Sequence, residues 1–370
     1  MKLSQFKFNL PTELIAQHPL PYRDDSRLMV LHRKTGAIEH KMMPDLISYF
    51  DEGDLFVFND TKVFPARLFA TKEKTNARIE VFLLRELSHE NRYWDVLVDP
   101  ARKIRIGNKL FFSNDSSIVA EVIDNTTSRG RTVRFLTDYN NDDFVDHLYA
   151  LGETPLPKYI QRVYENTETD EESRKQFDIS LREQRKEDRD RYQAIFAKHI
   201  GAVAAPAACL HFSKTILKRL EIRGVDMQFI TSHMSLGNFK SVDVEDLTKH
   251  KVDSEQIFIS QSVSDAVDRA HAGKHRICAV GTEIMRALET VAGTQGQVPP
   301  FTGWTNKFIY PPYDFAVANA FFVNMYMPQS SQLIQVAAFA GYENTMAAYK
   351  EAVKEEYRFG DYGDAMLVVD

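Results

Sequence analysis

The sequence predicts an α/β protein that carries a separate, smaller β domain, and three observations support this prediction. The chain of 370 residues exceeds the roughly 100–200 residues of a single domain, so two domains are expected. Short β-type runs follow one another from about residue 62 to residue 150, without helical segments between them. Beyond residue 195, strand and helix patterns alternate, which is typical of a parallel or mixed α/β sheet, open or closed.

The first strand is an apolar run from Leu55 to Phe58, bounded by turn-forming residues as a buried strand should be. It ends in the polar sequence Asn59-Asp60-Thr61. Six β-type runs then follow, separated by polar turns, and the last of them is TVRFLT. Closely spaced strands of this kind indicate a small antiparallel barrel or sandwich.

The β segment has an uneven charge. Residues 62–110 contain eleven Lys or Arg against six Asp or Glu, whereas residues 111–150 contain three against seven. Arg102, Lys103, Arg105 and Lys109 are concentrated in the basic half. Two interpretations stay open, a solvated strand face and an edge that contacts phosphates.

Residues 162–191 form a mixed-charge run with few apolar anchors, which predicts a mobile surface loop or a short exposed helix. After it, Ser213 can cap a helix that Gly224 ends, and Val225 to Thr231 then reads as a strand. A second unit of this kind has a helical stripe that Gly273 stops and a strand that leads into Gly281-Thr282. In such sheets ligands bind at the carboxyl ends of the strands, where His233 and Thr282 would project.

The composition excludes several classes of protein. Only two cysteines occur, Cys209 and Cys278, so neither a disulfide framework nor a cysteine-rich zinc site is expected. No run of 18 apolar residues and no secretory signal occurs, so we expect a cytoplasmic protein without a membrane span. The formal charge of −6 disfavours non-specific polyanion binding over the whole surface, although a local basic face can still hold RNA.

Three strings carry polar or very small residues where chemistry could occur. Residues 199–213 combine tiny side chains with a histidine near each end, one of them His211, and this string fits either a ligand contact or a tight packing seam. Residues 231–239 follow a predicted strand and offer His233 as an acid or base, or as a structural histidine. Gly281-Thr282 precedes a helix whose N-terminus favours an anion, but Glu283 would occupy or repel that anion.

Together these strings resemble the S-adenosylmethionine:tRNA ribosyltransferase-isomerase family of queuosine biosynthesis, over nearly the full length of the chain. The resemblance implies an α/β barrel-like domain built from both chain ends, residues 1–61 and 151–370, with a β-barrel domain inserted at residues 62–150. The segments that carry it are Leu14–Pro19, Phe58–Thr61, Pro65–Leu68, Arg191–Gln193, Gly201–Pro206, Leu210–Phe212 and Tyr362–Met366.

The same resemblance implies the function. Family members transfer and isomerise the ribosyl part of S-adenosylmethionine onto the aminomethyl group of a 7-deazaguanine in tRNA, which releases adenine and methionine and gives epoxyqueuosine. S-adenosylmethionine is the co-substrate, tRNA is the partner, and no metal is needed. The sulfonium acidifies the neighbouring C5′–H, so a positioned base can start the reaction. The oligomeric state stays open, a monomer included.

The resemblance also implies site residues. His211 and His233 are the expected acid or base, and Arg286 is expected to bind a carboxylate or phosphate. The expected cofactor-binding residues are Phe212, Gly237, Gly281, Thr282, Arg286 and Asn324. The expected substrate-binding residues are Asp60, Arg67, Arg102 and Lys103.

Several positions depart from the family pattern. The usual GTTSVR is Gly281–Arg286 with the sequence GTEIMR here, which introduces the negative charge of Glu283. NFHLPKS is replaced by Asn324–Ser330 with the sequence NMYMPQS, so a histidine becomes Tyr326 and a lysine becomes Gln329. Two alternatives therefore stay open: a divergent paralogue with a changed substrate, and a non-catalytic RNA- or ligand-binding protein on the same scaffold.

Overall fold

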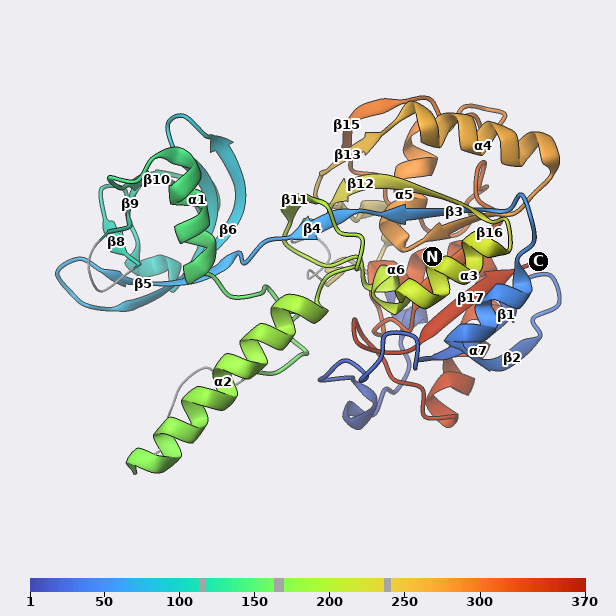
Figure 1. Ribbon diagram of the computed structural model, residues 1–370, viewed down its shortest axis with the longest axis horizontal. Coiled ribbons are helices and arrows are strands. Elements are labelled where there is room, and N and C mark those ends of the chain that lie inside the picture. The colour runs from blue at the N-terminus through green and yellow to red at the C-terminus, as the bar shows by residue number, and fades with distance from the viewer. Residues whose placement is uncertain (113–116, 163–169, 236–240) are drawn as a thin grey trace. The chain divides into compact units, whose positions relative to one another are not determined.

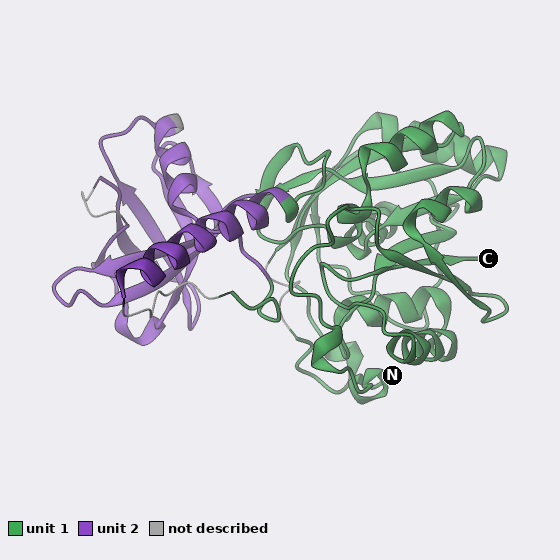
Figure 2. Ribbon diagram, turned by 60° about the horizontal axis from the view of Figure 1, so that its bottom comes forward, with its two compact units in different colours: residues 1–62, 157–162, 191–370 green, residues 63–156, 163–190 purple. Residues whose placement is uncertain are grey.

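The chain divides into two compact units in a computed structural model that describes residues 1–112, 117–162, 170–235 and 241–370. The first unit comprises residues 1–62, 157–162 and 191–370, and the second comprises residues 63–156 and 163–190 (Figure 2). Each unit has its own sheet. None of the described helices is both long and apolar enough to cross a membrane.

A nine-stranded mixed sheet forms the centre of the first unit (Figure 1). The sequence allowed either an open or a closed sheet. This sheet is open, and its edge strands are β15 (Phe301–Thr305) and β2 (Ile38–Met42). The strand order is β15 (Phe301–Thr305), β13 (Glu255–Ile259), β12 (Asp226–His233), β3 (Leu55–Asn59), β14 (Ile277–Val280), β16 (Ala320–Asn324), β17 (Ala365–Val369), β1 (Arg27–His32) and β2 (Ile38–Met42).

The four central strands β12, β3, β14 and β16 run parallel, so their carboxyl ends lie at one edge of the sheet. The predicted strand at Leu55 to Phe58 is confirmed as β3, which is buried on both faces. Leu55 and Val57 pack on one face of the sheet, whereas Phe56 and Phe58 pack on the other. This alternation follows from the two-residue period of a strand.

Helices cover both faces of the sheet. The face of Leu55 is covered by α4 (Gln261–Gly273), α5 (Thr282–Val291), α6 (Ser331–Ala340) and α7 (Tyr342–Lys354). The face of Phe56 is covered by α3 (Lys214–Ile222) and by the 3₁₀ turns η3 (Met43–Tyr49) and η5 (Ala207–His211). The predicted cap of α3 is confirmed, because the Ser213 hydroxyl accepts a hydrogen bond from the amide of Ile216 at 3.1 Å.

The second unit contains a closed, antiparallel six-stranded barrel, which confirms the predicted inserted β-barrel. Alternate side chains such as Val96 and Val98 fill its interior. The strand order is β10 (Gly130–Leu136), β7 (Tyr93–Asp99), β6 (Arg78–Ser88), β5 (Arg67–Lys72), β8 (Lys109–Phe111) and β9 (Val119–Asn125). Two further short strands, β4 (Thr61–Val63) and β11 (His199–Ala202), pair with each other in a separate ribbon.

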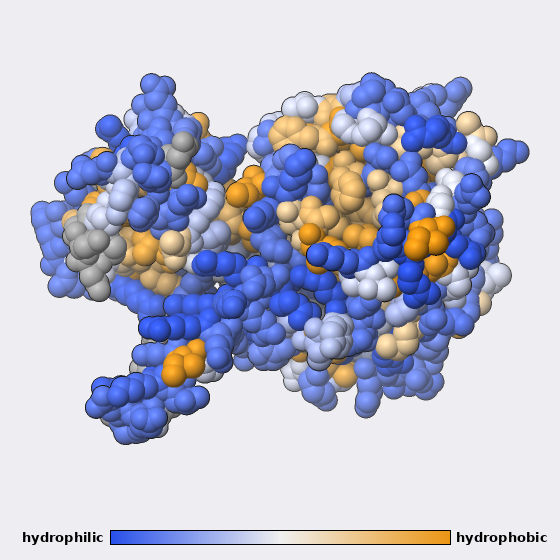
Figure 3. Space-filling view, viewed as in Figure 1, coloured by the Kyte–Doolittle hydropathy of each residue, from blue (hydrophilic) through white to orange (hydrophobic). Residues whose placement is uncertain are grey.

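Two helices belong to the second unit, α1 (Asn141–Leu151) and α2 (Glu171–Arg191). The sequence analysis did not predict α1. The charged run at 162–191 contains α2, which has 21 residues and is therefore longer than the short exposed helix expected there. Its surface is largely hydrophilic (Figure 3), as its composition requires.

Candidate active site

The first unit encloses a cavity of about 360 Å³ at the carboxyl ends of the parallel strands. This position agrees with the rule that ligands of open α/β sheets bind beyond the carboxyl edge. The volume falls within the roughly 300–1,000 Å³ of small-molecule pockets. The cavity is lined by residues 157–159, Ala204, Ala205, Ala207, Met234, Thr282, Glu283, residues 326–330, Gly360 and Asp361, among others.

The run of tiny residues supplies one wall of the cavity. Ala204, Ala205 and Ala207 line it, and their small side chains leave the volume open. The next two residues, Ala208 and Cys209, pack instead into the core beneath the sheet. The run therefore contains both a cavity wall and a packing seam, and its contact with a ligand stays a prediction.

The N-terminus of α5 supplies a second wall. Gly281 has φ +94° and ψ 153°, a conformation that is essentially restricted to glycine. A Cβ built on Gly281 would lie 2.4 Å from Oε1 of Glu283, so the carboxyl of Glu283 folds back over this glycine. The helix end therefore holds an acid of its own chain, and the expected binding of a ligand anion by Gly281 and Thr282 is not what this geometry favours.

Glu283 is a buried acid on the cavity wall, with 2% of its surface exposed. Burial raises its pKa to about 7, against opposing contributions from its own backbone amide and from Arg286. Its Oε1 has no hydrogen-bond partner among the described residues. Thr282 lines the same cavity, and its carbonyl accepts a hydrogen bond from Gln335 at 2.9 Å.

Asp361 is the second acid of the cavity. One carboxylate oxygen accepts a hydrogen bond from the Tyr159 hydroxyl at 2.7 Å, and the other accepts one from the Tyr192 hydroxyl at 2.6 Å. Burial raises the pKa of Asp361, whereas these two hydrogen bonds lower it. The phenols fix the orientation of the carboxylate.

His211 lies in a closed network beside the cavity and is not one of its lining residues. The ring nitrogens contact the Ser26 hydroxyl at 2.8 Å through Nδ1 and the Asn324 carboxamide oxygen at 3.2 Å through Nε2. Burial lowers the pKa of His211 to about 4, so the ring is neutral at physiological pH. The ring lines a smaller pocket together with Arg23 and Arg191.

Asn324 and Phe212 were expected to bind the cofactor, but both are fully buried in contacts within the protein. The Asn324 amide nitrogen donates to the carbonyl groups of Gly360 and Asp361 at 3.0 and 3.2 Å, which tethers the cavity-lining loop to β16. The ring of Phe212 packs against Phe58 with 4.8 Å between ring centroids. Apolar packing therefore holds Phe212 in the core, and it is not a cavity residue.

His233 ends β12 and is partly exposed. Its Nδ1 lies 2.8 Å from the Thr61 hydroxyl. A Cβ on Gly201 would lie 2.6 Å from the ring, so this glycine makes room for the histidine. Burial lowers the pKa of His233, the charge of His199 lowers it further, and Asp60 opposes both.

The two histidines do not converge in one cavity. Asn324, the partner of His211, ends β16, whereas His233 ends β12. Strands β3 and β14 lie between β12 and β16, and three strand spacings correspond to roughly 14 Å. Neither histidine lines the 360 Å³ cavity, which lies at the carboxyl edge of the same sheet. Both imidazoles lie near the carboxyl edge of the sheet, but at separate places along it.

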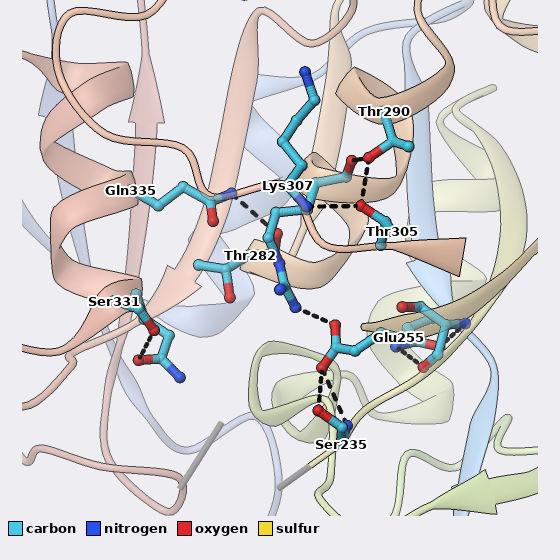
Figure 4. Close-up of polar contacts among 12 residues, drawn as sticks. Ser235, Glu255, Thr282, Thr290, Thr305, Lys307, Ser331 and Gln335 are labelled. Atoms are coloured by element: carbon cyan, nitrogen blue, oxygen red, sulfur yellow. Dashed lines mark hydrogen bonds and ion pairs between the residues drawn. The ribbon is translucent and has the colours of Figure 1, made fainter. Parts of the chain in front are cut away.

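Arg286 was expected to bind a carboxylate or phosphate of a ligand, but it binds a carboxylate of this chain. Its guanidinium forms a buried ion pair with Glu255 on β13. The other Glu255 oxygen accepts a hydrogen bond from the Ser235 amide at 3.1 Å, and Figure 4 shows Glu255 beside Ser235. The charge of Arg286 is therefore already compensated.

The comparisons with known proteins agree with this architecture. A family model described as queuosine biosynthesis protein matches residues 3–368. The S-adenosylmethionine:tRNA ribosyltransferase-isomerase of Bacteroides fragilis is 60% identical over 370 residues, and that of Phocaeicola vulgatus is 58% identical, each with full coverage of both chains. The crystal structure of S-adenosylmethionine tRNA ribosyltransferase from Thermotoga maritima matches with a TM-score of 0.52 and 30% identity, covering 99% of this chain and 100% of that one.

The chain belongs to this family. Family membership confirms the resemblance seen in the sequence. Family membership does not assign a role to any single side chain, and these roles are inferred from the geometry described above.

The remaining expected residues lie in other parts of the chain. Asp60, in the first unit, accepts a hydrogen bond from the Thr231 hydroxyl at 2.6 Å. Arg67, in the second unit, contacts Glu80 at 3.2 Å. Arg102 and Lys103 are exposed in the second unit. Gly237 lies outside the described residues.

Sequence reasoning missed Asp361 and Tyr159, and named Glu283 and Tyr326 without placing them on a wall of the site. The family segment at Tyr362–Met366 begins one residue after Asp361, which was the available signal. Tyr159 precedes the charged run and carries no such signal. Within the part of the chain that the structure describes, no three His, Cys, Asp or Glu side chains are grouped as metal ligands would be.

Proposed function

We propose that this chain is an S-adenosylmethionine-dependent tRNA ribosyltransferase-isomerase whose reaction takes place in the 360 Å³ cavity. It would transfer and isomerise the ribosyl moiety of S-adenosylmethionine onto 7-aminomethyl-7-deazaguanine in tRNA to give epoxyqueuosine. The observation that carries the proposal is 60% identity over the whole length to a relative of that name. With tRNA as its substrate, the proposed location is the cytoplasm.

The cavity suits a cationic small molecule. Its lining includes two buried acids, Glu283 and Asp361, one exposed lysine, Lys158, and small and apolar side chains such as Ala204 and Met327. S-adenosylmethionine combines apolar and aromatic parts with a positively charged sulfonium. The sulfonium can lie near the acids, while the apolar and aromatic parts lie against the alanines. The substrate base must leave its stack to reach an enclosed cavity, which costs little for a loop nucleotide.

Neither of the two expected acid–base histidines lines the cavity, so we propose that His233 contacts the tRNA outside the cavity and does not transfer a proton within it. It is partly exposed at a strand end, and Thr61 engages one ring nitrogen. We propose that His211 is a positioning residue, because Ser26 and Asn324 engage both of its ring nitrogens. Asn324 in turn holds the carbonyls of the loop that presents Asp361.

The exposed basic residues Arg102 and Lys103 of the inserted barrel are proposed to contact tRNA phosphates. Both belong to the basic half of the inserted segment. Phosphate contacts of this kind give affinity without reading sequence, so the base specificity would come from the cavity.

Adenine release provides the test. The protein is incubated with S-adenosylmethionine and with tRNA that carries the 7-aminomethyl-7-deazaguanine, and tRNA that lacks this base is the matched control. Adenine and epoxyqueuosine formed only with the precursor tRNA would support the proposal. Tight binding of both substrates without turnover would instead support a non-catalytic binding protein, and weak binding of either substrate would support a changed substrate.

A further inference from the structure

A second, smaller pocket of the first unit adjoins the proposed reaction cavity, because Asp361 lines both. Its lining also contains two arginines, Arg23 and Arg191, and the aromatic side chain of Tyr22. Arginines beside an accessible aromatic ring are typical of sites that hold RNA, since a guanidinium binds phosphate and a ring stacks on a base. The position and the residue types of this pocket therefore point to a nucleotide.

Neutral backbone groups orient the two arginines. Arg23 donates to the carbonyl of Leu210 at 3.2 Å, and Arg191 donates to the carbonyls of Leu20 and Pro21 at 2.6 and 3.2 Å. Carbonyl acceptors fix the direction of a guanidinium but do not cancel its charge. A guanidinium has several N–H donors, so Arg191 can bind a phosphate oxygen in addition to these carbonyls.

The positive charges of the two arginines act on each other. Burial and the charge of Arg191 together lower the pKa of Arg23 to about 10, and Tyr362 opposes them. Arg23 therefore stays charged at neutral pH beside a second positive charge. An anion placed between the two guanidinium groups would relieve this repulsion.

The acids near the pocket have partners elsewhere in the protein. Asp24 follows Arg23 in the sequence, but its carboxylate accepts a hydrogen bond from the Ser213 hydroxyl at 2.7 Å and does not line the pocket. Asp361 holds two phenol hydroxyls, as described above. His211 is neutral, so the lining carries two positive charges against at most one negative charge.

Tyr22 extends the pocket on its solvent side, with 70% of its surface exposed. A single exposed aromatic side chain is common on protein surfaces and needs no explanation by itself. The pocket has a volume of about 30 Å³, which leaves room for a water-sized group such as a phosphate oxygen but not for a base. A base attached to that phosphate would therefore lie outside the pocket, where the ring of Tyr22 is accessible.

We propose that this pocket is an RNA-binding subsite. Arg23 and Arg191 hold a phosphate next to the nucleotide whose base enters the cavity, and Tyr22 stacks on a neighbouring base. The inference rests on the proposed function, because that function supplies the RNA and places its base in the cavity.

The affinity for tRNA at several salt concentrations tests the arginines. Unmodified tRNA is a suitable probe, because phosphate contacts do not require the substrate base. Arg23→Gln and Arg191→Gln should each reduce the slope of log affinity against log salt by about 0.7–1, whereas Arg191→Lys keeps the charge and should retain the parent slope. Arg223→Gln is the matched control and should also retain it. Arg223 donates to the Phe50 carbonyl at 2.9 Å, but it pairs with Asp51 and does not line the pocket.

The same binding assay tests the aromatic side chain. Tyr22→Ala should weaken tRNA binding by roughly five- to hundredfold, the range for the loss of one stacked base, without changing the salt slope. Tyr22→Phe keeps the ring and should bind like the parent protein. Melting temperatures of all variants check that they fold.

A synthetic RNA stem–loop with the substrate nucleotide in its loop locates the phosphate. A methylphosphonate replaces one charged linkage by a neutral one. When the neutral linkage flanks the substrate nucleotide, Arg23→Gln should cause little further loss of affinity, because the contact is already gone. When the neutral linkage lies in the stem, the loss caused by Arg23→Gln should persist.

The carboxylate of S-adenosylmethionine is the rival anion for this pocket. Decarboxylated S-adenosylmethionine keeps the sulfonium and lacks the carboxylate, so it is the matched probe. If Arg23→Gln weakens the binding of S-adenosylmethionine but not of the decarboxylated form, and leaves the salt slope of tRNA binding unchanged, the pocket holds that carboxylate and the inference is wrong.

Unchanged salt slopes in both glutamine variants, or unchanged tRNA affinity in Tyr22→Ala, would also overturn the inference. If the parent protein binds tRNA but releases no adenine from S-adenosylmethionine, the proposed function fails, whereas the salt slopes still decide whether the two arginines hold an RNA phosphate.

Discussion

Replacement of Gly281 by alanine tests the arrangement at the N-terminus of α5 most directly. Two separate costs are expected. The backbone at φ +94° and ψ 153° disfavours any residue with a Cβ, by about 1–3 kcal/mol. The new Cβ would also lie 2.4 Å from Oε1 of Glu283, the far end of a flexible side chain at the cavity wall, so the carboxyl must rotate away at a cost of about 0.5–1.5 kcal/mol more. The sum is about 1.5–4.5 kcal/mol.

Gly341 supplies the control that separates these costs. It also begins a helix, α7, with φ 86° and ψ 141°, so Gly341→Ala carries a similar backbone cost. The nearest atom to its added Cβ is Nδ2 of Asn344 at 3.8 Å, an ordinary contact. Gly281→Ala should therefore lower the melting temperature further than Gly341→Ala, by roughly 1–6 °C for a domain of this size.

The double substitution Gly281→Ala with Glu283→Ala completes the test. Removal of the carboxyl takes away the clash but leaves the backbone cost. The two substitutions should therefore be non-additive in chemical denaturation, with a coupling of about 0.5–1.5 kcal/mol in favour of the double variant. Additive effects, or equal melting temperatures of Gly281→Ala and Gly341→Ala, would mean that Glu283 does not fold back over the glycine.

Three further outcomes follow from the contacts. Because burial lowers the pKa of His211 from 6.5 to about 4, the stability that its neutral form provides above pH 6.5 is lost as the pH falls towards 4, by about 3 kcal/mol. Denaturation midpoints of the parent protein should fall more over this range than those of His211→Gln, and an equal fall would contradict the assignment. Arg286→Met should cost about 3–5 kcal/mol because it removes the ion-pair partner of the buried Glu255 carboxylate, and adding Glu255→Gln should recover part of that loss; no recovery would argue against the pair. Arg102→Ala and Lys103→Ala should each reduce the salt dependence of tRNA binding by a slope of about 1, whereas unchanged slopes would favour the solvated-face interpretation.

The order of strands and helices could be predicted because local patterns determine it. The buried run of β3 and the capping serine of α3 are signals that depend only on neighbouring residues. The helix α2 was underestimated because a 21-residue helix with few apolar residues has no stripe to reveal it, although charge pairs such as Glu171 with Lys175 at 2.8 Å support it.

The sequence predicted which loops lie at the site, but not which of their side chains face it. His211 and Phe212 are neighbours in sequence, yet one ring enters a polar network and the other enters the aromatic core. Arg286 forms its ion pair with Glu255, which lies on β13, 31 residues earlier in the chain. Such pairings depend on which side chains the sheet brings together, and no local pattern contains that information.

The charges around the cavity determine which part of the substrates can enter it. Arg286 and Glu255 cancel each other, so ionised Glu283 leaves this wall with a net negative charge. A sulfonium restores neutrality there, whereas a phosphate would place like charges together in a region of low dielectric. Glu283 therefore occupies the N-terminus of α5, which is one of the two outcomes that the sequence analysis named for an anion there. In the proposed complex the cationic donor occupies the cavity, only the neutral base enters beside it, and the tRNA phosphates stay on the solvent-exposed surface.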